Sequence, residues 1–208
     1  MKKNYKSTVN ACFTGYVVQA IVNNFVPLLF LTFNKSYGIE LSKITALITV
    51  NFILQLCIDF LSAFFIDKIG YRAAAIMAHV FAAAGLISLT VLPEILPSPF
   101  VGLLISVVLY AVGGGLLEVI VSPIVEACPT DNKEKMMSLL HSFYCWGSVA
   151  VVGISTLYFS IFTTANWKYL ALIWAVVPIV NALNFIRVPI APLIEEGETG
   201  LSFKQLLG

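Results

Sequence analysis

The chain has 208 residues, of which 59% are hydrophobic and only 11% are charged. A soluble domain carries about 25% charged residues, so this composition excludes an ordinary water-soluble enzyme or binding domain. The formal net charge is +1 and the basic residues form no tract, which argues against a nucleic-acid partner. The composition instead indicates a protein that crosses a membrane several times.

Six apolar runs are long enough to span a bilayer, because a hydrocarbon core of roughly 30 Å requires about 20 residues of helix. Helices are expected because lipid offers no partner for backbone amides and because the runs lack the alternation of barrel strands. We therefore predict an all-α membrane protein with six transmembrane helices. In chain order, the runs cover residues 9–33, 44–66, 73–93, 99–126, 136–162 and 168–189.

Polar side chains interrupt the first two runs. A carboxylate inside a span costs roughly 2.5 kcal/mol or more, so Asp59 in the second run is a candidate functional residue. Amides recur at four-residue spacing in both runs, which predicts a shared polar interior that contacts a solute. Hydrogen bonds that only join helices are the alternative role for these amides. The predicted solute-contacting amides are Gln19, Asn23, Asn24, Asn51 and Gln55.

Titratable groups also occur in the later runs. The fourth run carries Glu118, and His141 near the start of the fifth run lies at a similar depth. A glutamine would suffice to join helices, whereas a carboxyl group is able to carry a proton. We therefore predict that Glu118, His141 and Asp59 couple transport to protons. The alternative for His141 is a neutral histidine that is bonded to a backbone carbonyl or that snorkels towards the cytoplasm, and this alternative is favoured for His79. Tyr144 is predicted to contact sugar hydroxyls or a sugar ring.

Backbone-weakening residues lie beside these polar groups. Pro27 follows Asn24, while Gly113–Gly115 and Pro123 flank Glu118 in the sequence. Kinked or broken helices commonly form the binding sites of transporters, so we expect the first and fourth helices to be distorted here. Distortion that serves packing alone is the alternative.

The loops carry basic residues unevenly. With six spans, nine Lys and Arg residues fall on the side of the N-terminus, and three fall on the other side: Lys35, Lys43 and Lys168. The positive-inside rule then places both termini in the cytoplasm and the protein in the cytoplasmic membrane. We predict a transmembrane domain over residues 1–190. Residues 191–208, acidic and then weakly amphipathic, are predicted to be a cytosolic linker.

The loop between the second and third runs carries a recognisable motif. It reads Ala63-Phe-Phe-Ile-Asp67-Lys68-Ile-Gly70-Tyr71-Arg72. This stretch resembles the signature G-x-x-x-D-[RK]-x-G-[RK]-[RK] of the major facilitator superfamily, with Ala63 in place of the first glycine and Tyr71 in place of one basic residue. The resemblance implies that the loop supports a cytoplasmic gate and does not bind the solute. The gate residues would be Asp67, Lys68, Gly70 and Arg72.

Two further stretches narrow this resemblance. The sequence Gly113-Gly-Gly-Leu-Leu-Glu118-Val with Ser122-Pro123, and the sequence Ser138-Leu-Leu-His141-Ser-Phe143, resemble the fucose and glucose/galactose permease branch. Fucose permeases also have an important acid in the first helix, where this chain has Asn23 and Asn24. The resemblance implies the N-terminal half of a twelve-helix bundle, built from two inverted three-helix repeats. We therefore expect a missing six-helix half, or a second copy, as a partner.

Taken together, these features predict a secondary active transporter of a small polar solute, a sugar, coupled to protons. No Lys or Arg lies deep in a span, so a phosphate or carboxylate substrate would find no countercharge. An intramembrane enzyme is not expected, because the chain lacks the G-x-S-G serine of rhomboid proteases. The cysteines show no CxxC spacing, and no metal or cofactor is predicted. The alternative function is the six-helix substrate-binding subunit of an ATP-driven importer.

Overall fold

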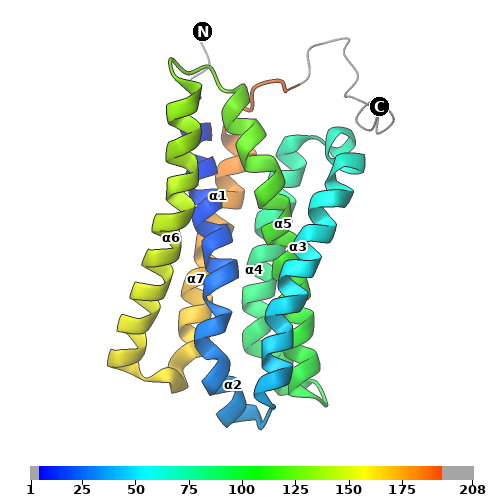
Figure 1. Ribbon diagram of the computed structural model, residues 1–208, viewed down its shortest axis with the longest axis vertical. Coiled ribbons are helices and arrows are strands. Elements are labelled where there is room, and N and C mark those ends of the chain that lie inside the picture. The colour runs from blue at the N-terminus through cyan, green and yellow to red at the C-terminus, as the bar shows by residue number, and fades with distance from the viewer. Residues whose placement is uncertain (1–4, 194–208) are drawn as a thin grey trace.

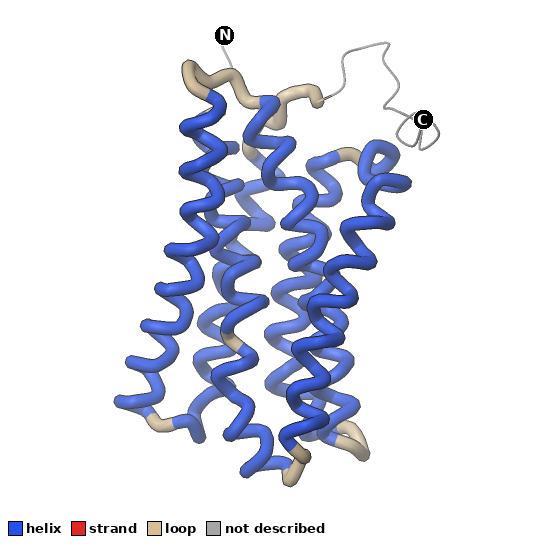
Figure 2. Tube along the Cα trace, in the orientation of Figure 1, coloured by secondary structure: helices blue, strands red, loops and turns tan. Residues whose placement is uncertain are grey.

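The computed structural model describes residues 5–193, and this part of the chain is a bundle of helices with short connections (Figures 1 and 2). Six helical segments are long and apolar enough to cross a membrane, as the sequence predicts. The first of these consists of three consecutive elements. The elements are α1 (Lys6–Asn24), η1 (Val26–Leu29), α2 (Phe30–Tyr37), α3 (Leu41–Ile69), α4 (Tyr71–Ile95), α5 (Pro99–Ala127), α6 (Lys133–Phe162), η2 (Thr164–Asn166) and α7 (Trp167–Arg187).

The predicted transmembrane domain ends in the structure with α7 at Arg187. Residues 188–193 continue without a helix. Most of the predicted linker, including its acidic and amphipathic parts at 195–207, lies outside the described residues.

The first transmembrane segment is interrupted, whereas the fourth is continuous. Pro27 has no N–H to donate to the carbonyl group of Asn23, and its ring crowds that carbonyl. The chain accordingly leaves the α-helix after Asn24 and passes through the 3-10 turn η1 before α2 begins. Pro123 lies inside α5, which still runs without a break from Pro99 to Ala127. The expected distortion of the fourth helix is therefore not a break.

The elements form two three-helix units of opposite direction. Segment α1–α2 with α3 and α4 forms the first unit, and α5, α6 and α7 form the second, so α1 and α5 are antiparallel (Figure 1). The units interlock, because α3 of the first packs on α5 of the second and α6 of the second packs on α1 of the first. Helices α1 and α5 are the most buried, and α3 and α6 are the most exposed.

Glycines bring α5 close to its neighbours. A Cβ atom on Gly113 would lie 2.6 Å from the backbone of α4 at Ala78 and Ala82, and one on Gly85 of α4 would lie 2.5 Å from Tyr110. A Cβ atom on Gly115 would lie 2.9 Å from Ile58 of α3. The glycines predicted to weaken the fourth helix are therefore needed for close packing.

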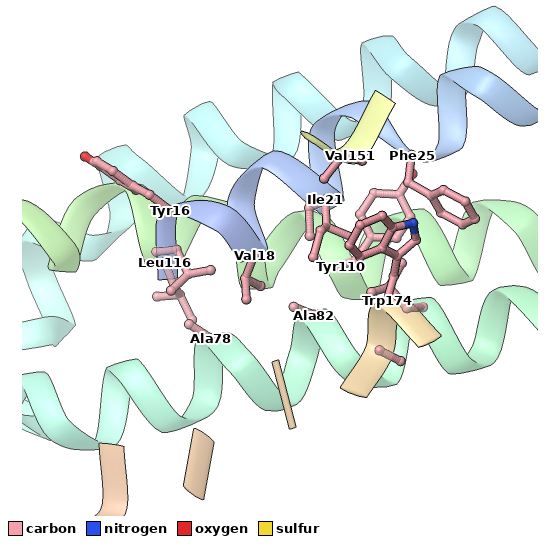
Figure 3. Close-up of a cluster of buried hydrophobic side chains, with 14 of the residues drawn as sticks. Tyr16, Val18, Ile21, Phe25, Ala78, Ala82, Tyr110, Leu116, Val151 and Trp174 are labelled. Carbon is pink, nitrogen blue, oxygen red and sulfur yellow. The ribbon is translucent and has the colours of Figure 1, made fainter. Parts of the chain in front are cut away.

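The apolar core lies around α1 and α5 (Figure 3). Ile21 of α1, Tyr110 of α5 and Trp174 of α7 meet there, and each is at most 8% exposed. The indole N–H of Trp174 donates to the hydroxyl group of Ser155 on α6, so its polar atom is satisfied inside the core.

A small polar cluster joins three segments at the end of the bundle opposite the termini. Glu94, near the end of α4, accepts hydrogen bonds from Tyr37 at 2.8 Å and from Lys168 at 2.7 Å. These residues come from α2 and from the start of α7. The ion pair is partly exposed, and such pairs contribute about 0–1 kcal/mol to stability. Its role is to align these helix ends more than to stabilise the fold.

Candidate functional site

A cavity of about 470 Å³ opens between α1, α3, α5 and α6. Its wall is amphipathic and contains one carboxyl group and one imidazole. Neither Lys nor Arg is among the residues that line it. The lining residues are Tyr16, Gln19, Asn23, Phe52, Glu118, Ser122, His141, Tyr144 and Cys145.

Glu118 faces the cavity and is paired with Gln19. The amide Nε2 of Gln19 donates to Glu118 Oε2 at 3.1 Å. Gln19 itself is only 5% exposed, whereas Glu118 is exposed in the chain as described. One helical turn away from this pair, Tyr16 of α1 and Ser122 of α5 are hydrogen-bonded through their hydroxyl groups at 2.9 Å. Two polar contacts therefore join α1 to α5 at the cavity wall.

His141 and Tyr144 enter the cavity from α6. The His141 ring lies 5.6 Å from the ring of Tyr16, centroid to centroid, and the Tyr144 ring lies 6.3 Å from it in an edge-on arrangement. Glu118 and His141, which were predicted to act together, therefore line one cavity together with Tyr16. The structure brings these two titratable groups into one site.

Asn23 is held by two further amides. Its Oδ1 accepts hydrogen bonds from Asn51 Nδ2 at 3.2 Å and from Gln55 Nε2 at 2.8 Å, and Gln55 Nε2 also donates to Asn51 Oδ1 at 2.9 Å. The NH₂ group of Asn23 remains on the cavity side, 3.4 Å from the hydroxyl group of Tyr144. Asn51 and Gln55 are buried behind Asn23 and are absent from the cavity wall. In the structure their hydrogen bonds join α1 to α3, as the alternative role would require, and their contact with a solute stays a prediction.

Asn24 lies apart from this cavity. Its amide donates to the carbonyl group of Ala20 at 2.8 Å and to the hydroxyl group of Ser148 at 3.1 Å. With Ser148 and Gly153 it lines a separate, mostly apolar groove between α1 and α6. Asn24 and Asn23 are adjacent in sequence, and the helical rotation of about 100° between neighbours turns them to different faces.

Asp59 is also absent from the cavity wall. Its Oδ1 atom is buried and has no hydrogen-bond partner among the described residues. Its backbone carbonyl accepts a hydrogen bond from Ser62, and Glu118 is close enough to interact electrostatically with its carboxyl group. Asp59 thus lies near the predicted proton-coupling residue without lining the cavity itself.

His79 is fully buried on another face of the bundle. Its Nδ1 lies 2.7 Å from the carbonyl oxygen of Ala75, so Nδ1 carries the proton and donates. Its Nε2 then accepts from the amide of Asn181, at 2.7 Å. This neutral, carbonyl-bonded state is the one favoured by the sequence, and it leaves His79 without access to the cavity.

The motif loop turns sharply at Gly70. Gly70 has φ 83° and ψ 146°, a conformation that glycine adopts without a steric penalty. Asp67 and Lys68 are exposed in the last turn of α3, and the carboxyl group of Asp67 is close enough to Tyr71 to interact with it electrostatically. The loop therefore lies at the same end of the bundle as the chain termini, away from the cavity lining.

Arg72 reaches from this loop to the end of α7. Its Nη1 donates to the carbonyl groups of Phe185 at 2.6 Å and Ile186 at 3.0 Å, and its Nη2 donates to that of Val188 at 2.8 Å. The last carbonyls of a helix lack partners within the helix, so the guanidinium satisfies them. Arg72 connects the loop to α7, a contact that the sequence did not indicate.

Four lining residues were not predicted as site residues: Tyr16, Phe52, Ser122 and Cys145. Cys145 lies four residues after His141, so helical spacing alone would have placed it on the same face. Phe52 gave no such signal, because an aromatic side chain in an apolar run usually faces lipid or the core. Within residues 5–193, no three His, Cys, Asp or Glu side chains are grouped closely enough to hold a metal ion.

The sequence of this chain matches the model of a known protein family. The family model described as Major Facilitator Superfamily matches residues 11–206, almost the whole chain. The chain belongs to the major facilitator superfamily. The resemblance of the loop at 63–72 is thereby confirmed at the level of the superfamily, and the assignment to the fucose and glucose/galactose branch stays a prediction. A search among curated proteins gave no match.

Solved structures of this superfamily share the fold. The xylose transporter XylE from E. coli in its inward-open conformation has a TM-score of 0.79 and 15% identity, over 91% of this chain and 49% of XylE. A D-xylose–proton symporter has a TM-score of 0.74 and 16% identity, over 89% of this chain and 48% of that protein. XylE with bound 6-bromo-6-deoxy-D-glucose has a TM-score of 0.76 and 13% identity, over 89% of this chain and 45% of that protein.

At such identities the similarity concerns the fold alone. The facilitator chain spans about half the length of the solved transporters that it matches. Its six helices therefore correspond to a half-bundle of the superfamily, as predicted, and the cavity lies on the wall of that half-bundle.

Proposed function

We propose that this chain forms one six-helix unit of a secondary active transporter that moves a sugar across the cytoplasmic membrane together with protons. The observation that carries the proposal is the cavity wall, which combines neutral amides and hydroxyls with one carboxyl group and no cation. Amides and hydroxyls donate and accept hydrogen bonds, as sugar hydroxyls do, and Phe52 and Tyr144 offer ring faces for apolar C–H groups. Phosphate or carboxylate substrates would meet Glu118 without a countercharge.

The proton-coupling role falls to Glu118, with His141 and Asp59 as accessory groups. Glu118 is the carboxyl group in contact with the cavity, and Gln19 fixes its position. His141 shares the cavity, and the buried Asp59 Oδ1 lacks a partner, which an ionised carboxylate inside a membrane would require. A protonated Asp59 avoids this cost. We therefore assign Asp59 a proton that it keeps during transport or exchanges more slowly than Glu118 does.

Transport requires a second six-helix unit opposite this cavity. The match to about half of each solved transporter supports this, as does the exposure of apolar side chains along α3 and α6. We propose that both termini are cytoplasmic, because described basic residues cluster at the end of the bundle that carries the chain termini. These residues are Lys6, Lys68, Arg72, Lys133, Lys135 and Arg187.

The test is uptake by proteoliposomes that contain this chain with its second six-helix unit. D-Xylose, D-glucose, D-galactose and L-fucose are supplied with and without an inward proton gradient. Accumulation of one of these sugars that disappears when a protonophore collapses the gradient is the expected result. If the sugar only equilibrates across the membrane, with or without the gradient, the proposed proton coupling is contradicted. If no sugar crosses the membrane, the proposed substrate class is contradicted. Uptake that requires ATP would favour the importer subunit, for which the family match offers no support.

A further inference from the structure

Gln19 occupies the position between the proton-binding group and the rest of the cavity. Its amide contacts Glu118 at 3.1 Å, it lines the cavity, and at 5% exposure it has little freedom to point elsewhere. Asn23 follows it by one turn on α1 and presents its NH₂ group to the same cavity. The sequence pattern placed Gln19 among the solute contacts, whereas the structure joins it to the carboxyl group.

A primary amide has a donating end and an accepting end. An ionised carboxylate only accepts, so it binds the NH₂ end of Gln19. A contact from the NH₂ group of Gln19 to Glu118 Oε2 is the one observed. The Oε1 atom of Gln19 is then left for other partners. A protonated Glu118 donates its O–H instead, and the amide satisfies it by turning Oε1 towards it. The NH₂ end of Gln19 is then left for other partners.

We propose that Gln19 transmits the protonation state of Glu118 to the sugar, by presenting an acceptor to the cavity when Glu118 is ionised and a donor when it is protonated. This rests on the proposed function above. Gln19 is thus a positioning residue, and no covalent bond forms or breaks apart from the O–H bond of Glu118. The proton comes from water on the side to which the cavity opens and returns to water on the other side. Since linkage is reciprocal, a sugar that prefers one amide orientation also shifts the protonation of Glu118.

Other titratable groups face Gln19 and Glu118, and their effects on the pH dependence of binding must be distinguished from that of Glu118. Tyr16 lies on the same helix as Gln19, and His141, Tyr144 and Cys145 face the cavity from α6. Asp59 interacts electrostatically with Glu118 from α3. Of these, His141 titrates nearest to neutral pH in its unperturbed state. A His141→Gln variant therefore belongs in the experiment.

The experiment measures the dissociation constant of the best-bound sugar among D-xylose, D-glucose, D-galactose and L-fucose. The measurements are made at about pH 3.5 and about pH 8, which lie on either side of the ordinary pKa values of carboxyl and imidazole groups. In the unmodified transporter the two constants should differ by about fivefold or more, the lower range of allosteric coupling. Gln19→Met removes both ends of the amide at similar volume. It should weaken binding and bring the two constants to within about twofold of each other, as Glu118→Gln should also do.

If Gln19 had only a structural role, its replacement would weaken sugar binding equally at both pH values, and the ratio of the two dissociation constants would stay the same. Gln19→Asn, which keeps the amide but falls one methylene short of Glu118, should also flatten the ratio, and it carries the test if Gln19→Met fails to fold. Thr14→Val, on the same helix outside the cavity, should retain the ratio. His141→Gln measures the share of the imidazole in the pH dependence, and a ratio that this variant flattens while the Gln19 variants keep it would overturn the inference. A Gln19 variant with the unmodified ratio, or an unmodified transporter without pH dependence, overturns the inference. Proton-driven accumulation would then leave the proposed function standing, so the two failures are distinguishable.

Discussion

At the scale of single residues, the cavity assigns different tasks to side chains of the same type. Asn23, Asn51 and Gln55 form one hydrogen-bonded group, yet only Asn23 reaches the cavity. Glu118 and Asp59 are both membrane-embedded carboxyl groups, yet only Glu118 has a side-chain donor and an open face. Burial and hydrogen bonding therefore single out Glu118 as the residue on which the proposed proton coupling would depend.

Replacement of Glu118 by Gln should separate exchange from accumulation. The amide mimics a permanently protonated carboxyl group, so the transporter should still exchange sugar across the membrane while losing accumulation driven by a proton gradient. Counterflow and gradient-driven uptake of radiolabelled sugar measure the two activities. Glu126→Gln, two turns further along α5 and outside the cavity, is the matched control. Accumulation by Glu118→Gln would make Glu118 a structural hydrogen-bonding residue.

At the scale of helices, close approach and tight turns organise the bundle. Gly113 lets α4 and α5 touch through their backbones, whereas a Cβ on Gly153 of α6 would meet nothing within 4 Å. The motif loop ends α3 and starts α4 through Gly70, and Arg72 then binds the end of α7. The loop and the end of α7 are therefore held together by hydrogen bonds at one end of the bundle.

Enlarging Gly113 should destabilise the bundle, and enlarging Gly153 should not. Gly113→Ala places a methyl group 2.6 Å from backbone atoms of α4, and such overpacking typically costs about 1–3 kcal/mol. Gly153→Ala enters open space and gains helix propensity. Thermal unfolding in detergent measures both variants. Equal melting temperatures would show that α4 and α5 separate at little cost.

Changes in the motif loop should act on the rate of transport. Asp67 lies at the end of α3, away from the cavity lining, so Asp67→Asn should slow uptake severalfold while equilibrium sugar binding stays nearly unchanged. Uptake rates and binding isotherms on the same preparation separate the two effects, with Lys43→Ala at the opposite end as a control. A large loss of binding in a folded Asp67→Asn protein would contradict the gate role.

At the scale of the whole molecule, α4 and α7 are tied together at both ends, and the cavity lies elsewhere. Lys168 and Glu94 join them at one end, and Arg72 binds the last carbonyls of α7 at the other. Thr8 of α1 also donates to the carbonyl group of Pro189, just beyond α7. Helices α3 and α6 are the least buried of the six spans. The contacts that join α4 and α7 at their ends involve none of the residues that line the cavity.

The proposed orientation predicts which end is reached from outside the cell. Lys35→Cys and Lys133→Cys lie at opposite ends of the bundle, with the accessible Cys57 and Cys145 replaced by alanine in both cases. A membrane-impermeant maleimide added to intact cells should label the cysteine at 35 and not the one at 133. Labelling of both from the same side would contradict the topology, and labelling of 133 alone would invert the orientation.

The sequence by itself determined the membrane class, the number of spans and the motif loop. Each depends on local quantities: the length of an apolar run, the cost of a charge in lipid, and the residues of one short turn. The bond from His79 to the carbonyl group of Ala75 also followed, since that carbonyl lies one helical turn away, whereas the bond to Asn181 on α7 did not.

Only the tertiary structure decided which polar residues meet in one cavity. Asn24 lines another groove, and Asn51 and Gln55 lie behind Asn23, although the four-residue spacing of the amides suggested that they share one interior. Phe52 lines the cavity, and no sequence pattern indicated that. Gly113–Gly115 likewise proved to serve close packing within an unbroken helix. Helical spacing fixes the face on which a side chain lies, but the neighbouring helices decide what that face contacts. The contacts of Gln19 with Glu118 and of Arg72 with α7 join residues more than 90 positions apart, and no local pattern encodes them.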